Sequence, residues 1–149
     1  MYKIDLHTHS IISRDGGISL SQYQKILTSH TLDYIAITDH DQIEFAQTAK
    51  KQLGERIIVG EEVKTQSGDL IGLFLNKLVK PHQSLKKTVK DIKDQGGLVY
   101  LPHPFDPRRS GITKSDTMSV LKDIDIFETF NSRYIFPKNG NQSAKNFAH

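Results

Sequence analysis

The chain has 149 residues, enough for one domain with a buried core, and it contains no cysteine, which excludes disulfides, thiolate zinc sites and cysteine nucleophiles. No apolar run approaches the roughly 20 residues of a membrane span, and the first residues lack the pattern of a secretory signal, so we expect a cytoplasmic protein outside the membrane. The 20 basic and 17 acidic residues give a formal charge of +3, which favours anionic substrates such as phosphate esters or reflects an ordinary solvated surface.

The first strand is predicted within residues 1–10, where an apolar run ends in His7 and His9. Where a strand frays into a loop, its twist can turn both imidazoles toward one point. Neutral imidazole is the commonest protein ligand for borderline divalent metals, so the pair indicates a metal site; the alternative is two ordinary surface histidines.

A polar loop carrying Asp15 follows, and the apolar spacing predicts a helix over 19–27. A strand at 33–38 then leads directly into His40. We expect Asp41 to cap the next helix.

The middle of the chain begins with a strand at 56–63 that carries Glu61 and Glu62. A turn leads into a second apolar run at 70–75, and the two runs are predicted to form a hairpin. A helix starting at Ser84 ends at a Gly-Gly pair before the next strand.

The last third of the chain contains a strand at 98–101 that leads into His103, followed by an arginine-bearing loop. A helix, a strand and another helix are predicted over 115–122, 124–128 and 141–149. Strands that alternate with helices indicate a mostly parallel sheet with helices outside, closed or partly closed into a barrel.

Apolar runs that end at once in His, Asp or Glu occur five times along the chain. In parallel α/β folds the carboxyl ends of the strands lie together on one face, where sites are built. We therefore expect these residues to meet.

Six motifs in order carry a resemblance to a known family. They are His7-Thr-His9, Ser13-Arg-Asp15-Gly16, Thr38-Asp39-His40-Asp41, Gly60-Glu-Glu62, Pro102-His103-Pro104 and Glu128-Thr-Phe-Asn131-Ser-Arg133. With them the chain resembles the PHP family, the polymerase and histidinol phosphatase superfamily of metal-dependent phosphoesterases. The resemblance implies a distorted (β/α)7 barrel with two or three divalent ions, manganese, zinc or iron, at the strand ends.

Carried over by position, the resemblance implies three metal sites. His7 and His9 would hold a first ion with the bridging carboxylate of Glu62, and His103 would reach a second. Asp15 and His40 would hold a third ion, and either could instead assist proton transfer.

Two departures from the family pattern stand out. Asp69 occupies a position where many members have histidine, and it could either ligate a metal or serve as a turn residue. A later Gly-Ser-Asp-x-His motif has no counterpart, so we expect a PHP barrel that is incomplete at its C-terminal end, with weaker metal binding and exposed strand edges that favour homo-oligomers.

Further side chains are candidates for substrate binding. Arg108, Arg109 and Arg133 could bind phosphate oxygens or be solvated cations, and Asn131 could position substrate or fix the strand end. Glu61 is expected to be structural.

The leading hypothesis is therefore hydrolysis of a small phosphomonoester or nucleotide by metal-activated water. Two alternatives stay open. One is a catalytically inactive module that binds a partner or nucleic acid, and the other is an amidohydrolase-like enzyme, since those barrels also begin with His-x-His.

Overall fold

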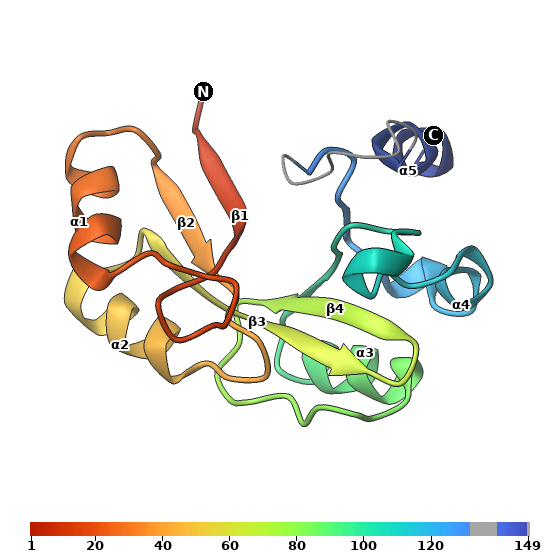
Figure 1. Ribbon diagram of the computed structural model, residues 1–149. Coiled ribbons are helices and arrows are strands. Elements are labelled where there is room, and N and C mark those ends of the chain that lie inside the picture. The colour runs from red at the N-terminus through yellow and green to blue at the C-terminus, as the bar shows by residue number, and fades with distance from the viewer. Residues whose placement is uncertain (132–139, 149) are drawn as a thin grey trace.

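A single curled sheet forms the centre of the molecule, of which the computed structural model describes residues 1–131 and 140–148 (Figure 1). Its strands lie in chain order: β1 (Ile4–Thr8), β2 (Tyr34–Ile37), β3 (Ile57–Thr65), β4 (Gly68–Leu73), β5 (Leu98–Leu101) and β6 (Ile126–Phe127). The sheet curls so far that His7 on β1 meets Glu128 just after β6, at 3.1 Å. This half-barrel matches the incomplete α/β barrel that the sequence predicted.

Five of the six strands in the described part of the chain run in one direction, as the expected mostly parallel sheet requires, and β4 runs against them. The β3–β4 hairpin is antiparallel, as predicted, but β5 also pairs antiparallel with β4 although α3 (Leu85–Lys93) lies between them. The reason is that β4 alone reverses the chain, and α3 returns it in the original direction beside β4. Consequently β1, β2, β3, β5 and β6 all run the same way and end at one edge.

Helices α1 (Leu20–Thr28), α2 (Glu44–Leu53) and α3 pack against the outer face of the sheet (Figure 1). Helix α4 (Lys114–Met118) lies between β5 and β6 in the chain, and α5 (Gly140–Ala148) contacts β6 through Phe147 and Phe127. Ser19 caps α1 with a capping box, and Ser84 caps α3, which fixes both starting points. Within the described residues, no helix is both long and apolar enough to cross a membrane.

Two helix predictions are corrected. Asp41 does not cap α2, whose cap position is Ile43 without a side-chain bond; its carboxylate instead accepts the Lys64 backbone N–H at 2.8 Å. The helix predicted over 115–122 ends at Met118, and a 3₁₀ turn follows at Leu121–Asp123.

Strand β3 is buried on both faces and separates two cores. Ile57, Val59 and Val63 point outward and pack with the helices. Ile58 points inward and packs with neighbours from the other strands. Since side chains alternate along a strand, Glu62 shares the inner face, at the end where the parallel strands stop.

Candidate metal centre

Backbone pairing at the strand ends brings the predicted residues together. An isolated bridge pairs His40 with Glu62, because the Glu62 N–H donates to Asp39 and the Asp41 N–H donates to Glu62. Thr8 pairs with Ile37, which sets His9 beside the same strand end. The fold thus delivers side chains from separate strands to one point.

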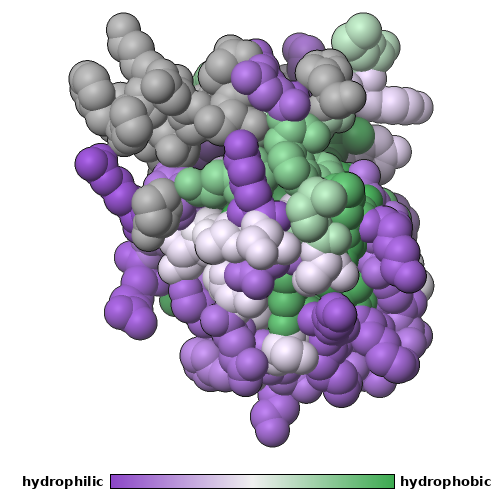
Figure 2. All heavy atoms as spheres, turned by 90° about the vertical axis from the view of Figure 1, so that its right-hand side faces the viewer, coloured by the Kyte–Doolittle hydropathy of each residue, from purple (hydrophilic) through white to green (hydrophobic). Residues whose placement is uncertain are grey.

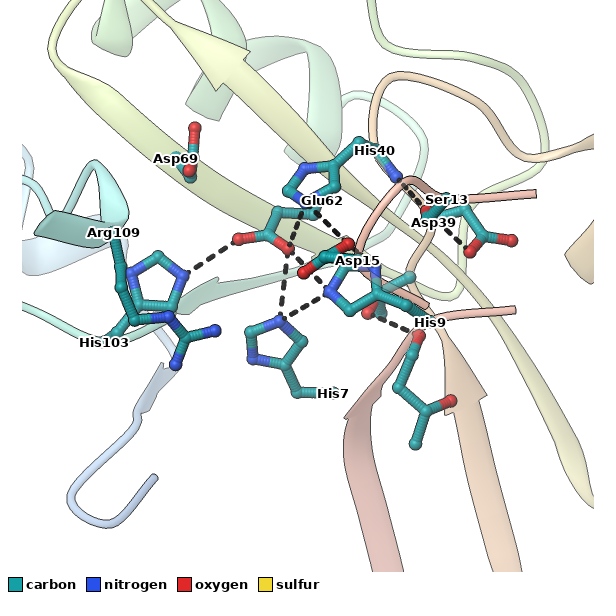
Figure 3. A network of polar contacts seen from close by, with 12 residues as sticks. His7, His9, Ser13, Asp15, Asp39, His40, Glu62, Asp69, His103 and Arg109 are labelled. Carbon is teal, nitrogen blue, oxygen red and sulfur yellow. Dashed lines mark hydrogen bonds and ion pairs between the residues drawn. The ribbon is translucent and has the colours of Figure 1, made fainter. Parts of the chain in front are cut away.

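Glu62 lies at the centre of this group (Figure 3). Its Oε2 atom lies 3.1 Å from His7 Nε2 and 3.0 Å from His9 Nε2, and the two nitrogens are 3.2 Å apart. Its Oε1 atom lies 3.0 Å from His103 Nε2. The four side chains that the sequence predicted to meet therefore do so, with Glu62 and His103 almost completely buried.

Asp15 and His40 form the more open side of the group. His40 Nε2 lies 3.5 Å from Asp15 Oδ1 and 3.6 Å from Glu62 Oε2. The side chains of Asp15 and His40 are 39% and 40% exposed, so solvent and small molecules can reach them. The imidazoles of His9 and His40 stack at 4.7 Å between ring centroids, which holds the His40 ring in place.

The donor set fits divalent metal binding. Two groups satisfy the spacing that one ion requires, His7 with Glu62 and His103, and His9 with His40 and Glu62. Ligands held about 2.1 Å from one ion lie about 3.0–3.4 Å apart at tetrahedral or octahedral angles. The His7, His9 and Glu62 atoms match this spacing, so a third grouping shares the same carboxylate.

The buried histidines and carboxylates of the group shift one another's pKa values toward the charged forms. Burial alone lowers the pKa of His7, but hydrogen bonds and charge from Glu128 and Glu62 raise it to about 9. Burial also acts to raise the pKa of Glu62, yet its bonds to His103, His7 and His9 hold that pKa well below its ordinary range. Without a metal, the site is therefore an ionised carboxylate bonded to a protonated His7.

Glu128 is a site residue that the sequence analysis left without a role. Its Oε1 accepts from His7 Nδ1 at 3.1 Å and from the Tyr100 hydroxyl at 2.9 Å, and its Oε2 accepts from the His103 backbone N–H at 2.5 Å. Burial raises its pKa, but the His7 bond and charge dominate and lower it to about 2. Glu128 thereby directs the His7 Nε2 toward Glu62, as carboxylates do behind metal-bound histidines. Its position directly after a strand was the available signal.

The predicted substrate residues lie beside the group. Arg109 Nη1 donates to Asn131 Oδ1 at 2.7 Å, and Asn131 Nδ2 donates to Glu128 Oε2 at 2.9 Å. Asn131 thus links the arginine to the carboxylate behind His7. Arg108 is exposed on the same loop, whereas Arg133 lies outside the described residues.

Asp69 and Glu61 have different surroundings. Asp69 is buried beside Lys64, whose Nζ lies 3.1 Å from its Oδ1, close in distance but poorly aligned for a hydrogen bond. Burial and the charge of Glu62 raise the pKa of Asp69 against the effect of Lys64. Glu61 points to the outer core, where it accepts from the Val79 N–H at 2.9 Å, and burial raises its pKa to about 8.

Asp39 holds the loop that carries Asp15. It accepts hydrogen bonds from the Ser10 N–H, the Ser10 hydroxyl and the Ser13 hydroxyl at 2.7–2.8 Å, and the Ser13 hydroxyl in turn accepts from the His40 N–H at 3.1 Å. Asp39 therefore positions His40 through the backbone rather than through its ring.

Two cavities flank the group. One of about 660 Å³ is lined by His7, His9, Glu128 and apolar side chains that include Phe130. The other, of about 730 Å³, is lined by Glu62, His40, His103 and several cations. Arg109 and Asp15 line both, so the donor group lies between two spaces that a small molecule could occupy.

A family model described as the PHP domain matches residues 5–121. Two uncharacterised proteins of Methanocaldococcus jannaschii are similar in sequence. One is 35% identical over 135 residues, with 88% of this chain and 53% of the relative covered. The other is 32% identical over 143 residues, with 87% of this chain and 82% of the relative covered. The chain thus spans about half the length of the first relative.

Two solved structures have a similar fold. A two-domain protein from Bacteroides vulgatus, described as containing a predicted PHP-like metal-dependent phosphoesterase, superposes with a TM-score of 0.64 at 19% identity, covering 85% of this chain and 43% of that one. A candidate metal-dependent phosphoesterase from Bifidobacterium adolescentis superposes with a TM-score of 0.71 at 13% identity, covering 99% and 83%. At these identities the likeness establishes the fold alone.

Proposed function

This chain belongs to the PHP domain family, and on that premise we propose that it is a metal-dependent phosphoesterase that acts on a small phosphorylated substrate, a phosphomonoester or nucleotide. The observation that carries the proposal is the convergence on Glu62. Three imidazoles lie within 3.1 Å of its two oxygens, and a cavity lined by both cations and carboxylates opens beside them. A carboxylate with donors on both oxygens is suited to bridge two ions.

We assign the ligands by these contacts. His7, His9 and Glu62 Oε2 would hold one ion, and Glu62 Oε1 with His103 would hold a second. Asp15 and His40 would hold a third, and Asp69 lies near the second. The all-nitrogen and oxygen donor set suits manganese, zinc or iron.

Divalent ions bound there would supply a Lewis acid that activates water and neutralises charge on the phosphoryl group and the leaving oxygen. The protein side chains do the rest. As an alternative to holding the third ion, Asp15 or His40 can accept the proton of the attacking water, since both side chains are partly exposed beside Glu62. Arg109, held by Asn131, can donate two parallel hydrogen bonds to phosphoryl oxygens.

The test is hydrolysis of p-nitrophenyl phosphate with manganese, zinc or iron(II) supplied in turn, before and after treatment with a chelator. We expect metal-dependent turnover that Glu62→Gln lowers at least 100-fold. The matched control is Glu55→Gln, because the Glu55 side chain is 88% exposed and its ion-pair partner among the described residues is Lys50. No turnover of this or any other phosphate ester with any of the three metals would refute the proposal.

The same preparations separate the two alternatives. Metal retention without hydrolysis of any phosphate ester would indicate an inactive module, to be tested for binding to nucleic acid. Hydrolysis of amides in place of esters would indicate an amidohydrolase-like enzyme.

A further inference from the structure

A second polar group lies on the same face of β3 as Glu62. Lys64 follows Glu62 by two residues, so its side chain emerges on the same side, roughly 6–7 Å further along the strand. Its Nζ lies 3.1 Å from Asp69 Oδ1 and 2.5 Å from Ser110 Oγ. The backbone register sets Lys64 directly opposite Asp69 on β4. The two contacts thus hold the ammonium between Asp69 and Ser110, on the same face of β3 as Glu62.

One cavity joins this group to the metal centre. The space of about 730 Å³ is lined by Glu62 and His103 and also by Lys64, Arg108 and Ser110. Asp41 and Asp69 line it too, and Asp69 is the ion-pair partner of Lys64. The Lys64 side chain is 39% exposed, so a molecule in the cavity can reach it. The ammonium donates one hydrogen bond, to Ser110 Oγ, and its contact with Asp69 is an ion pair, so further N–H groups can be directed at a ligand.

The loop that carries Ser110 and Arg108 is tightly built. A Cβ atom on Gly111 would lie 2.5 Å from the His103 carbonyl oxygen. A Cβ atom on Gly68 would lie 2.4 Å from the Ser110 carbonyl oxygen. The buried Asp106 accepts from the Arg108 backbone N–H at 3.0 Å. Close backbone contacts of this kind hold the loop in place before any ligand arrives.

We propose that Lys64, Ser110 and Arg108 form a distal anion subsite that binds a second negatively charged group of the substrate. Preferred substrates are phosphate esters whose leaving group carries a phosphate or carboxylate on a short linker, because Lys64 follows Glu62 by only two residues on one face of β3. This inference rests on the proposed function for the identity of the first group. Lysine, arginine and a hydroxyl together match the oxygens of either anion.

Binding tests the subsite without hydrolysis. Propane-1,3-diylbisphosphonate, 4-phosphonobutanoate and propylphosphonate share a three-carbon chain and differ only in the distal group. In calorimetric titrations of the manganese-supplemented protein, the two anionic tails should bind at least tenfold more tightly than the neutral tail, and the better of the two identifies the preferred anion. An aminopropylphosphonate should bind more weakly than propylphosphonate.

Variants assign the preference to these residues. Lys64→Met and Arg108→Met should each reduce the ratio of affinities for anionic over neutral tails at least fivefold, whereas Lys86→Met, on the exposed face of α3, should preserve it. If Lys64→Met fails to fold because Asp69 loses its partner, Arg108→Met decides. Equal affinities for all tails, or a ratio that neither variant changes, would overturn the subsite.

The phosphoesterase activity and the distal anion subsite can fail independently, and the experiments distinguish the two failures. A preserved affinity ratio without turnover of the matching phosphate esters would leave the subsite standing and remove the phosphoesterase. Turnover of propyl phosphate at the same kcat/KM as the bisphosphate ester would support the phosphoesterase and remove the subsite.

Discussion

Substitution of Glu128 by glutamine should weaken metal binding, and the loss should grow with pH. The raised pKa of His7, about 9 against 6.5, corresponds to a few kcal/mol in favour of the protonated ring. Glu128 and Glu62 together supply this effect and also offset the cost of burying the charged ring. Both partners are buried, with side chains 8% and 7% exposed, so solvent does little to screen the pair.

The sign follows from competition between a proton and a metal for His7. A protonated imidazole cannot ligate, so metal affinity in the wild-type protein should rise about tenfold per pH unit up to about 9. In Glu128→Gln the pKa of His7 should fall, so the proton competes less with the metal, but loss of the orienting carboxylate costs about 10–100-fold in metal affinity. Near pH 7 these effects partly cancel, and at pH 9 the full loss should appear.

The assay is a competition titration with a chromophoric zinc chelator at pH 7 and pH 9, with an NMR titration of the His7 ring in the metal-free protein. Tyr100→Phe is the matched control, because it removes another hydrogen bond to Glu128 while keeping the charge. Wild-type affinity that does not change between pH 6 and pH 8, or a His7 ring that titrates as an ordinary histidine, would refute the reasoning.

Single substitutions at Glu61, His9 and Gly16 test three further features of the site and its surroundings. Burial raises the pKa of Glu61 to about 8, so the stability that its protonated form contributes is present below pH 4.5 and is lost as pH rises through about 8, by at most about 1.4 kcal/mol per pH unit. In urea unfolding without metal, the free energy of unfolding of Glu61→Gln should therefore rise relative to the wild type between pH 5 and pH 8. A difference that stays constant over this range would contradict the prediction. His9→Ala should lose at least one bound ion, while its free energy of unfolding without metal should change by no more than about 1 kcal/mol. If the variant keeps its metal and loses stability instead, His9 has a structural role. Gly16→Ala should displace the loop that carries Asp15 and lower metal affinity, because the added Cβ would lie 2.1 Å from the Ser10 carbonyl oxygen. Gly17→Ala should match the wild type, because a Cβ there has no atom within 4 Å. Equal effects of the two substitutions would rule out the steric argument.

Self-association is a separate expectation, from the strand edges. Among the described residues, β1 and β6 each pair with a strand on one side only, and Ile4 on β1 is 48% exposed. Hydrophobic side chains also reach the surface on the face that Figure 2 shows, and in the C-terminal half the exposed apolar residues include Met118 and Phe130. Ile4→Lys should therefore lower the sedimentation coefficient of any oligomer toward that of the monomer, and an unchanged oligomer would locate the contact elsewhere.

The sequence predicted the donor group because that group depends on strand ends. His7, His40 and His103 sit at or just after the carboxyl end of a strand, and strands of one direction deliver their ends to one edge. Glu62 lies inside β3, just past the point where its pairing with β2 stops. The single reversal at β4 was partly visible as a hairpin, but the antiparallel β4–β5 pairing was not, because it depends on where α3 returns the chain.

The details that the sequence could not supply depend on backbone geometry. Asp41 has the composition of a helix cap, yet the bridge between His40 and Glu62 turns it toward the Lys64 N–H. Lys64 is an ordinary strand lysine until the register places Asp69 opposite it. Glu128 was visible as a strand-end acid, but its role requires the ring orientation of His7, which no spacing in the sequence specifies.

The most direct test of the metal centre is the metal content of the wild-type protein and of Glu62→Gln, measured by elemental analysis after equilibration with manganese or zinc and removal of free ions. Glu62 contacts His7, His9 and His103 at 3.0–3.1 Å, so its loss as a bridging carboxylate should affect every site that shares it. We predict at least one ion, and up to three, per wild-type chain and much less than one per variant chain, with circular dichroism showing both folded. Equal metal content in the two proteins would contradict the assignment of Glu62 as the shared ligand.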